Sequence, residues 1–188
     1  MTVPKYLRPV PWRPATLPPQ ERSAQWLLEL VATACLDAPD CPYLPQVEAG
    51  VRKTFCNMLV SDLTRALGCE VPHLLPKPVD CPHCGEHFPG YGEARVLEMR
   101  QWLVGEGIAS HGWERLTDGH VAQAMADQGQ VAVALYQGPV ASSGHVALVI
   151  PSQGQPGVWI AQAGASCFSR GLLGRGFGAL PVEFFGHP

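Results

Sequence analysis

The sequence has 188 residues, of which 46% are hydrophobic and 15% are charged, and its formal net charge is −3. These values are typical of a single globular core and argue against a disordered chain. The small negative charge provides no basic surface for nucleic acid or for an anionic membrane, so we expect neither as a partner.

The first 20 residues differ from the rest of the chain in composition. They contain six prolines, which exclude a helix and predict an extended arm at 1–20 followed by a domain at 21–188. The arm lacks the apolar core of a secretory signal, and no apolar run reaches the roughly 18 residues of a membrane-spanning helix. We therefore expect the protein to be synthesised in the cytoplasm without a signal peptide.

The first predicted helix covers residues 21–35, where apolar residues recur at helical spacing. It should end before Asp37-Ala38-Pro39, because the residue before a proline is disfavoured in a helix. Residues 36–50 then form a loop that leads directly into the next helix. This loop, with Tyr43 in it, would form one wall of a cleft in front of that helix, although Tyr43 as a single residue could equally be a packing residue.

The central predicted helix covers residues 53–68 and carries a cysteine in its first turn. Thr54 would cap this helix and Gly68 would end it. Cys56 would lie near free backbone N–H groups and the positive end of the helix dipole, which favour the nucleophilic thiolate. The alternative is that Cys56 is a small apolar residue that fills space in the core. A core-facing stripe is formed by Phe55, Leu59, Leu63, Ala66 and Leu67.

Residues 69–92 are rich in proline and cysteine and predict an irregular insertion. Within it, Cys81 and Cys84 form a C-x-x-C pair that is followed by His87. Thiolates and an imidazole at this spacing can bind one zinc ion, so a structural zinc at the Cys81/Cys84 loop is one hypothesis. A local disulfide or free thiols are the alternatives.

Two more helices are predicted at 93–104 and 118–128, the second capped by Thr117 or Asp118 and ended by Gly129. The apolar spacing then changes to that of strands. Short runs bounded by Gly, Pro and Ser predict a meander of antiparallel strands at 131–136, 145–150, 158–163 and 182–185. Helices followed by a sheet predict an α+β fold.

His145 begins the second of these strands, directly after a glycine that would allow substrate or backbone to come close. If Ile150 pairs with Gly157 in a hairpin, Gln162 lies opposite His145. The Gln162 amide oxygen would then accept the Nδ1 proton and leave Nε2 to deprotonate Cys56. A slip of one residue would place an alanine there instead. A structural histidine and a glutamine at a sheet edge are the alternatives.

A cysteine at a helix start, a histidine on a strand and a polar residue on the next strand follow the order of papain-like thiol hydrolases. Several segments resemble the CHAP and NlpC/P60 group of bacterial and phage peptidoglycan hydrolases, over roughly residues 25–185. These segments are Thr54-Phe55-Cys56-Asn57-Met58-Leu59-Val60-Ser61-Asp62, then Gly68, the Trp102 and Trp113 region, Gly144-His145-Val146-Ala147-Leu148-Val149 and Gln162-Ala163-Gly164.

The resemblance implies a papain-like fold in which Cys56 is the nucleophile, His145 is the base and then the acid, and Gln162 orients the imidazole. It implies no metal or cofactor for the chemistry, and hydrolysis of amide bonds in the peptide stems of peptidoglycan. The protein would be a monomeric phage lysin or a secreted antibacterial toxin, acting on the cell wall or in the periplasm. A toxin would also have an immunity protein as a partner. The alternative functions are a Cys-His acyltransferase or transglutaminase-like enzyme and a non-enzymatic, zinc-stabilised binding module.

Overall fold

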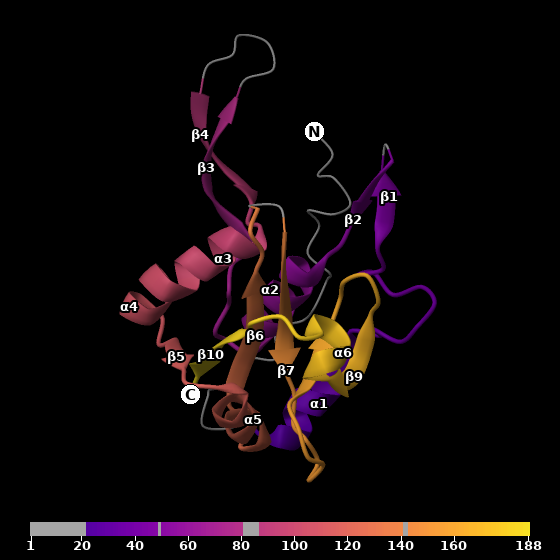
Figure 1. Ribbon diagram of the computed structural model, residues 1–188. Helices are drawn as coiled ribbons and strands as arrows, with labels where there is room; N and C mark the ends of the chain where they lie inside the picture. Colours follow the sequence, from indigo (N-terminus) through magenta and orange to yellow (C-terminus); the bar gives the residue numbers. More distant parts are fainter. Residues whose placement is uncertain (1–21, 49, 81–86, 141–142) are drawn as a thin grey trace.

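The computed structural model describes residues 22–48, 50–80, 87–140 and 143–188. In these residues the chain is a mixed α/β protein with one six-stranded antiparallel sheet and two separate two-stranded ribbons (Figure 1). The predicted N-terminal arm and the Cys81/Cys84 pair lie outside the described residues.

The helices are α1 (Ala24–Thr33), α2 (Cys56–Ala66), α3 (Val96–Trp102), the π-helical η3 (Leu103–Gly107), α4 (Ile108–Ser110), α5 (Gly119–Asp127) and α6 (Leu173–Phe177). The strands are β1 (Gln46–Glu48), β2 (Val51–Lys53), β3 (Leu74–Asp80), β4 (His87–Glu93), β5 (Glu114–Leu116), β6 (Val131–Gln137), β7 (Gly144–Val149), β8 (Trp159–Gln162), β9 (Phe168–Leu172) and β10 (Glu183–His187).

Local capping explains where most helices begin and end. Ser23 accepts a hydrogen bond from the backbone N–H of Trp26, and Asp118 accepts one from His120, so α1 and α5 begin with side-chain caps. Gly68 has φ +72° and ends α2, as predicted. The prediction that Thr54 caps α2 is wrong, because the N-cap residue is Phe55, which provides no side-chain hydrogen bond.

The main sheet has the strand order β5-β10-β6-β7-β8-β9. Strands β6, β7 and β8 are consecutive neighbours, as the predicted meander requires. The expected fourth strand, β10, instead crosses back to pair with β6, and β9 pairs with β8. Strand β5 has three residues, and β9 contains Ser169, Arg170 and Gly171, so neither has the apolar pattern that predicts a strand.

The register between β7 and β8 differs from the predicted one. Val149 pairs with Ile160, which is a shift of two residues relative to a register that pairs His145 with Gln162. Because side chains alternate with a period of two, this shift leaves Gln162 on the same face of the sheet as His145. Gln162 is therefore a diagonal neighbour of His145 rather than its direct partner.

The prediction of an irregular insertion is wrong for the described part of residues 69–92. Strands β3 and β4 pair antiparallel over seven residue pairs and form a ribbon that projects from the body (Figure 1). Three prolines interrupt the strand pattern in the sequence, namely Pro76, Pro78 and Pro89. A two-stranded ribbon tolerates them because each strand has an outer edge that requires no hydrogen-bond donor.

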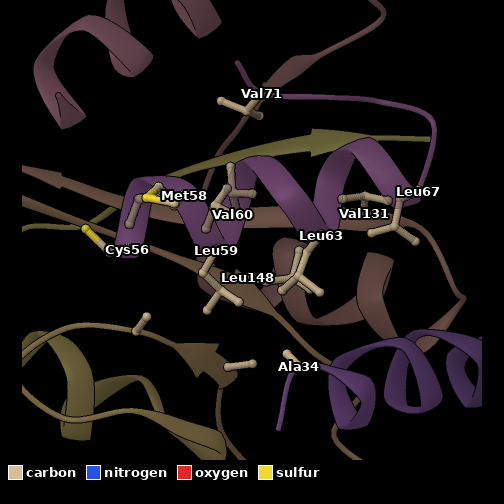
Figure 2. Close-up of a cluster of buried hydrophobic side chains, with 14 of the residues drawn as sticks. Ala34, Cys56, Met58, Leu59, Val60, Leu63, Leu67, Val71, Val131 and Leu148 are labelled. Atoms are coloured by element: carbon tan, nitrogen blue, oxygen red, sulfur yellow. The ribbon is translucent and has the colours of Figure 1, made fainter. Parts of the chain in front are cut away.

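Helices cover both faces of the main sheet. Helices α1, α2 and α3 pack on one face, and α5 and α6 pack on the other. Helix α2 lies at the centre of the first layer, with Leu59 and Leu63 near Leu148 of β7 (Figure 2). Within the described residues, no helix is long and apolar enough to span a membrane.

Candidate active site

Cys56 is the first residue of α2, and its side chain is only 5% exposed. Backbone N–H groups near its sulfur, including that of Val146 in β7, favour the thiolate. Burial raises the pKa of the thiol above its ordinary value of 9.0, and these N–H groups only partly offset that effect. The helix start favours the thiolate as expected, but burial outweighs this effect, and the thiol is protonated at neutral pH.

His145 lies in β7 with its ring against the ring of Phe177, at a centroid separation of 4.7 Å. Its Nε2 lies 2.8 Å from Oε1 of Gln162. Burial lowers the pKa of the imidazole below 6.5, and the hydrogen bond to Gln162 partly offsets this shift. The ring is therefore neutral at pH 7 and can accept a proton.

The ring nitrogens of His145 have the opposite roles from those predicted. Nε2 donates to the Gln162 amide oxygen, so Nδ1 is the nitrogen left to act as a base. Gly164 lies beside this part of the ring, since a Cβ on Gly164 would be 3.1 Å from Cε1 and 3.7 Å from Nδ1. The absence of a side chain at this position keeps the Nδ1 side of the ring uncrowded.

Gln162 is held at both ends of its amide. Its oxygen accepts from His145, and its Nε2 donates to the backbone carbonyl of Ser166 at 3.2 Å. The side chain is 3% exposed, so these partners satisfy a polar group that would otherwise be costly to bury. The prediction that Gln162 and His145 interact is confirmed, although they are paired diagonally.

Cys56 lies beside β7 close to the position of His145 in the chain. The backbone N–H that acts on the Cys56 thiol belongs to Val146, the residue directly after His145. Val146 faces α2, and the His145 ring faces the layer of α6. Among the described residues, no hydrogen bond joins the Cys56 sulfur to the His145 ring.

A shallow pocket of about 130 Å³ opens beside Cys56. It contains charges of both signs from Glu93 and Arg95, at the junction of β4 and α3. Asn57 fixes this junction to α2, because its amide donates to Glu93 Oε1 at 2.8 Å and to the carbonyl of Ala94 at 3.0 Å. The other lining residues are Thr54, Cys56, Val96, Ser143 and Gly144.

No family model matches this chain. A search of the curated proteins finds no match either.

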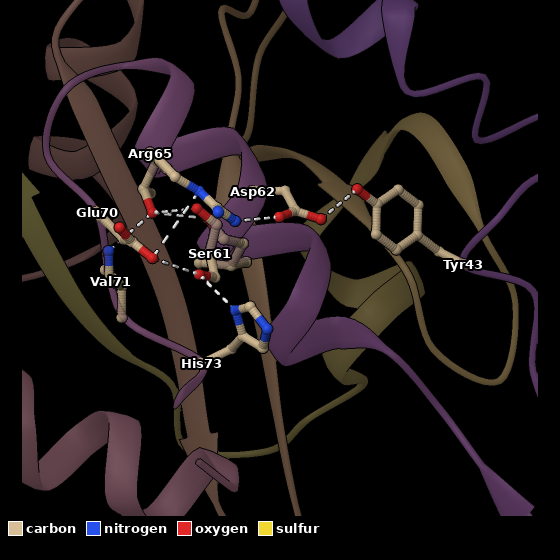
Figure 3. A network of polar contacts seen from close by, with 9 residues as sticks. Tyr43, Ser61, Asp62, Arg65, Glu70, Val71 and His73 are labelled. Atoms are coloured by element: carbon tan, nitrogen blue, oxygen red, sulfur yellow. Dashed lines mark hydrogen bonds and ion pairs between the residues drawn. The ribbon is translucent and has the colours of Figure 1, made fainter. Parts of the chain in front are cut away.

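Sequence reasoning missed Glu93 and Arg95 as site residues because it placed both in a helix at 93–104. In the structure Glu93 is the last residue of β4 and Arg95 is the N-cap of α3. Sequence reasoning also assigned Tyr43 to the loop that would line the cleft. Tyr43 is instead 1% exposed, and its hydroxyl donates to Asp62 of α2 at 2.8 Å (Figure 3). Tyr43 is therefore a packing residue, which was the alternative for it.

The described residues contain no group of three or more His, Cys, Asp or Glu side chains placed to hold a metal ion. Cys81 and Cys84 are not among them, and the side chain of His87 is also outside the description. Zinc at that loop therefore stays a prediction.

Proposed function

We propose that this chain is a papain-like cysteine hydrolase that cleaves amide bonds in the peptide stems of peptidoglycan. Cys56 is the nucleophile, His145 is the base and then the acid, and Gln162 orients the imidazole. Such an enzyme would act on the cell wall or in the periplasm as a phage lysin or as a secreted antibacterial toxin. The resemblance of the cysteine, histidine and glutamine segments to peptidoglycan hydrolases supports this choice of substrate.

One observation carries the proposal: the Cys56 sulfur contacts the backbone of β7 next to a neutral histidine that is fixed by a buried glutamine. A buried structural cysteine requires no such neighbours. A thiol hydrolase requires all of them, because its nucleophile, base and orienting group must lie close together. The helix start also supplies backbone N–H groups for the negative charge that develops on the substrate oxygen.

The proposed reaction begins when Nδ1 of His145 accepts the thiol proton. The Cys56 sulfur then attacks the amide carbonyl, and the backbone N–H groups of Cys56 and Val146 stabilise the charge that develops there. The protonated imidazole donates its proton to the leaving amine, which leaves an acyl group on sulfur as a thioester. Water activated by the same imidazole then hydrolyses the thioester and restores the thiol. No cofactor takes part in these steps.

The pocket beside Cys56 suits a zwitterionic peptide substrate. Arg95 would contact a carboxylate and Glu93 would contact an ammonium group, and both kinds of group occur on the stem peptides of peptidoglycan. This pairing favours a substrate with both charges over an acyl chain without charge.

The proposal is tested by incubating soluble peptidoglycan fragments with the wild type and with Cys56→Ala, then identifying the products by mass spectrometry. We expect the wild type to release shortened stems or separated cross-links and Cys56→Ala to be inactive. Cys69→Ala is the matched control, because Cys69 is also buried but lies beyond the other end of α2. Equal products from wild type and Cys56→Ala would contradict the proposal.

The same experiment with an added primary amine separates hydrolysis from acyl transfer. A hydrolase gives free carboxylates as its main products whether or not the amine is present. Predominant transfer of the acyl group to the amine would instead support the acyltransferase alternative.

A further inference from the structure

Two cysteines outside the candidate active site lie against the same residue. Cys41, in the loop between α1 and β1, accepts a hydrogen bond from the backbone N–H of Tyr43 at 3.4 Å. Cys167, just before β9, donates its S–H to the backbone carbonyl of Tyr43 at 3.3 Å. Both sulfurs therefore lie within 3.4 Å of atoms of one residue, although the two cysteines are far apart in the chain.

The two thiols also influence each other. Burial raises the pKa of Cys41 to about 11, and the neighbouring Cys167 contributes further through charge and side-chain contact. Cys41 is 4% exposed, whereas Cys167 is only partly buried. An oxidant would therefore reach Cys167 first, and Cys41 would be the second thiol to react.

We propose that Cys41 and Cys167 are a redox pair that forms a disulfide by exchange with a small-molecule or protein disulfide. The Cys167 thiolate attacks the oxidant, which forms a mixed disulfide and releases one thiol. The Cys41 thiolate then attacks the Cys167 sulfur, which forms the Cys41–Cys167 bond and releases the second thiol. The oxidant is thereby reduced to two thiols, and the protein loses its two thiol protons.

The bond would connect two segments that meet beside the candidate site. One is the loop that holds the buried Tyr43, and the other contains Ser166, whose carbonyl accepts from the Gln162 amide. If the proposed function holds, the disulfide also fixes the segment that positions Gln162 against His145. The bond itself depends only on the positions of the two sulfurs, so it can be tested without an activity assay.

The experiment treats the full chain with oxidised glutathione, blocks the remaining thiols, and maps disulfide-linked peptides by mass spectrometry. We expect a Cys41–Cys167 linked peptide in the wild type and in Cys35→Ser, and none in Cys167→Ser. Cys35 is the matched control, because it is exposed and also lies near Cys41. The oxidised wild type should unfold about 5 to 10 °C higher than the reduced protein, since the bond closes a long loop.

Two results would overturn the proposal. In the first, the native protein is treated with the oxidant and then unfolded, and both Cys41 and Cys167 are still alkylated as free thiols. In the second, Cys41 links mainly to Cys35. Both results come from the wild type, so they hold even if a variant folds poorly. If the Cys41–Cys167 bond forms but the reduced protein does not cleave peptidoglycan, the result counts against the proposed function and not against the redox pair.

Discussion

Cys56 illustrates a competition between two effects on one residue. Its place at a helix start and its N–H neighbours favour the thiolate, but burial of the sulfur opposes any charge, and burial has the larger effect on its pKa. Sequence reasoning could predict the helix start but not the burial, because the depth of a side chain depends on distant segments such as β7. The proposed reaction therefore needs a base to deprotonate the thiol, and we assign that role to the neutral His145.

The raised pKa of Cys56 predicts its reaction with iodoacetamide. Only the thiolate reacts, so the labelling rate should rise about tenfold per pH unit up to a pKa above 9.0. Peptide mass spectrometry after short exposures between pH 6 and pH 10 measures this rate for each cysteine separately. A rate that is already constant near pH 7 would show that Cys56 exists as a thiolate, contrary to this expectation.

Helix α6 packs against Gln162 on the face of the sheet that α5 and α6 cover. A Cβ on Gly176 would lie 2.2 Å from Gln162 Oε1 and 2.8 Å from Ile160 Cδ1. The Gln162 oxygen must therefore move in Gly176→Ala, and the hydrogen bond that orients His145 would be lost.

We expect Gly176→Ala to lower kcat for peptidoglycan cleavage by about 10- to 100-fold while the protein stays folded, because a misdirected base retains part of its function. Steady-state kinetics together with circular dichroism tests this expectation. Gly174→Ala is the control, since a Cβ there meets no atom within 4 Å and the residue belongs to the same helix. Similar kinetics for the two variants would show that Gln162 does not orient His145.

The sequence predicted most elements with a strong local signal. Asp118, Gly68 and Gly129 mark helix ends through their own hydrogen bonds or backbone angles, so α5 could be placed closely and α1 and α2 approximately. The β7–β8 register could not be predicted, because the loop between these strands permits more than one pairing of equal polarity. Gln162 still meets His145, as predicted, because a shift of two residues leaves both side chains on the same face of the sheet.

At the scale of the whole molecule, α2 is surrounded by other segments rather than lying at the surface. Its polar residues Ser61 and Asp62 are buried, and each has a partner in the network of Figure 3. Sequence reasoning placed Ser61 off the core-facing stripe. A buried polar face cannot be distinguished from a solvated one by periodicity, since its partners, such as Tyr43 and His73, come from other parts of the chain.

The buried His73 predicts how the stability of the whole protein depends on pH. Burial and then the nearby Arg65 lower the pKa of His73 below 6.5, and His145 is shifted in the same direction by burial. Below pH 6.5 the unfolded chain therefore binds more protons than the folded chain, and stability falls as the pH drops through the folded pKa values.

Urea unfolding at pH 7, 6 and 5 measures this effect. We expect the free energy of unfolding to decrease over this range and to decrease less steeply in His73→Gln. His120→Gln is the control, because His120 is exposed on α5. An equally steep decrease in His73→Gln and in the wild type would mean that His73 does not contribute.

In the proposed reaction, Cys56 carries the substrate acyl group during turnover. The most direct measurement mixes the protein with peptidoglycan stem peptides, quenches in acid within seconds, and searches the Cys56 peptide for a thioester by mass spectrometry. We expect an acyl adduct on Cys56 that hydroxylamine removes, together with no adduct and no turnover in Cys56→Ala. Turnover by Cys56→Ala, or an acyl group carried by another residue, would contradict this role of Cys56.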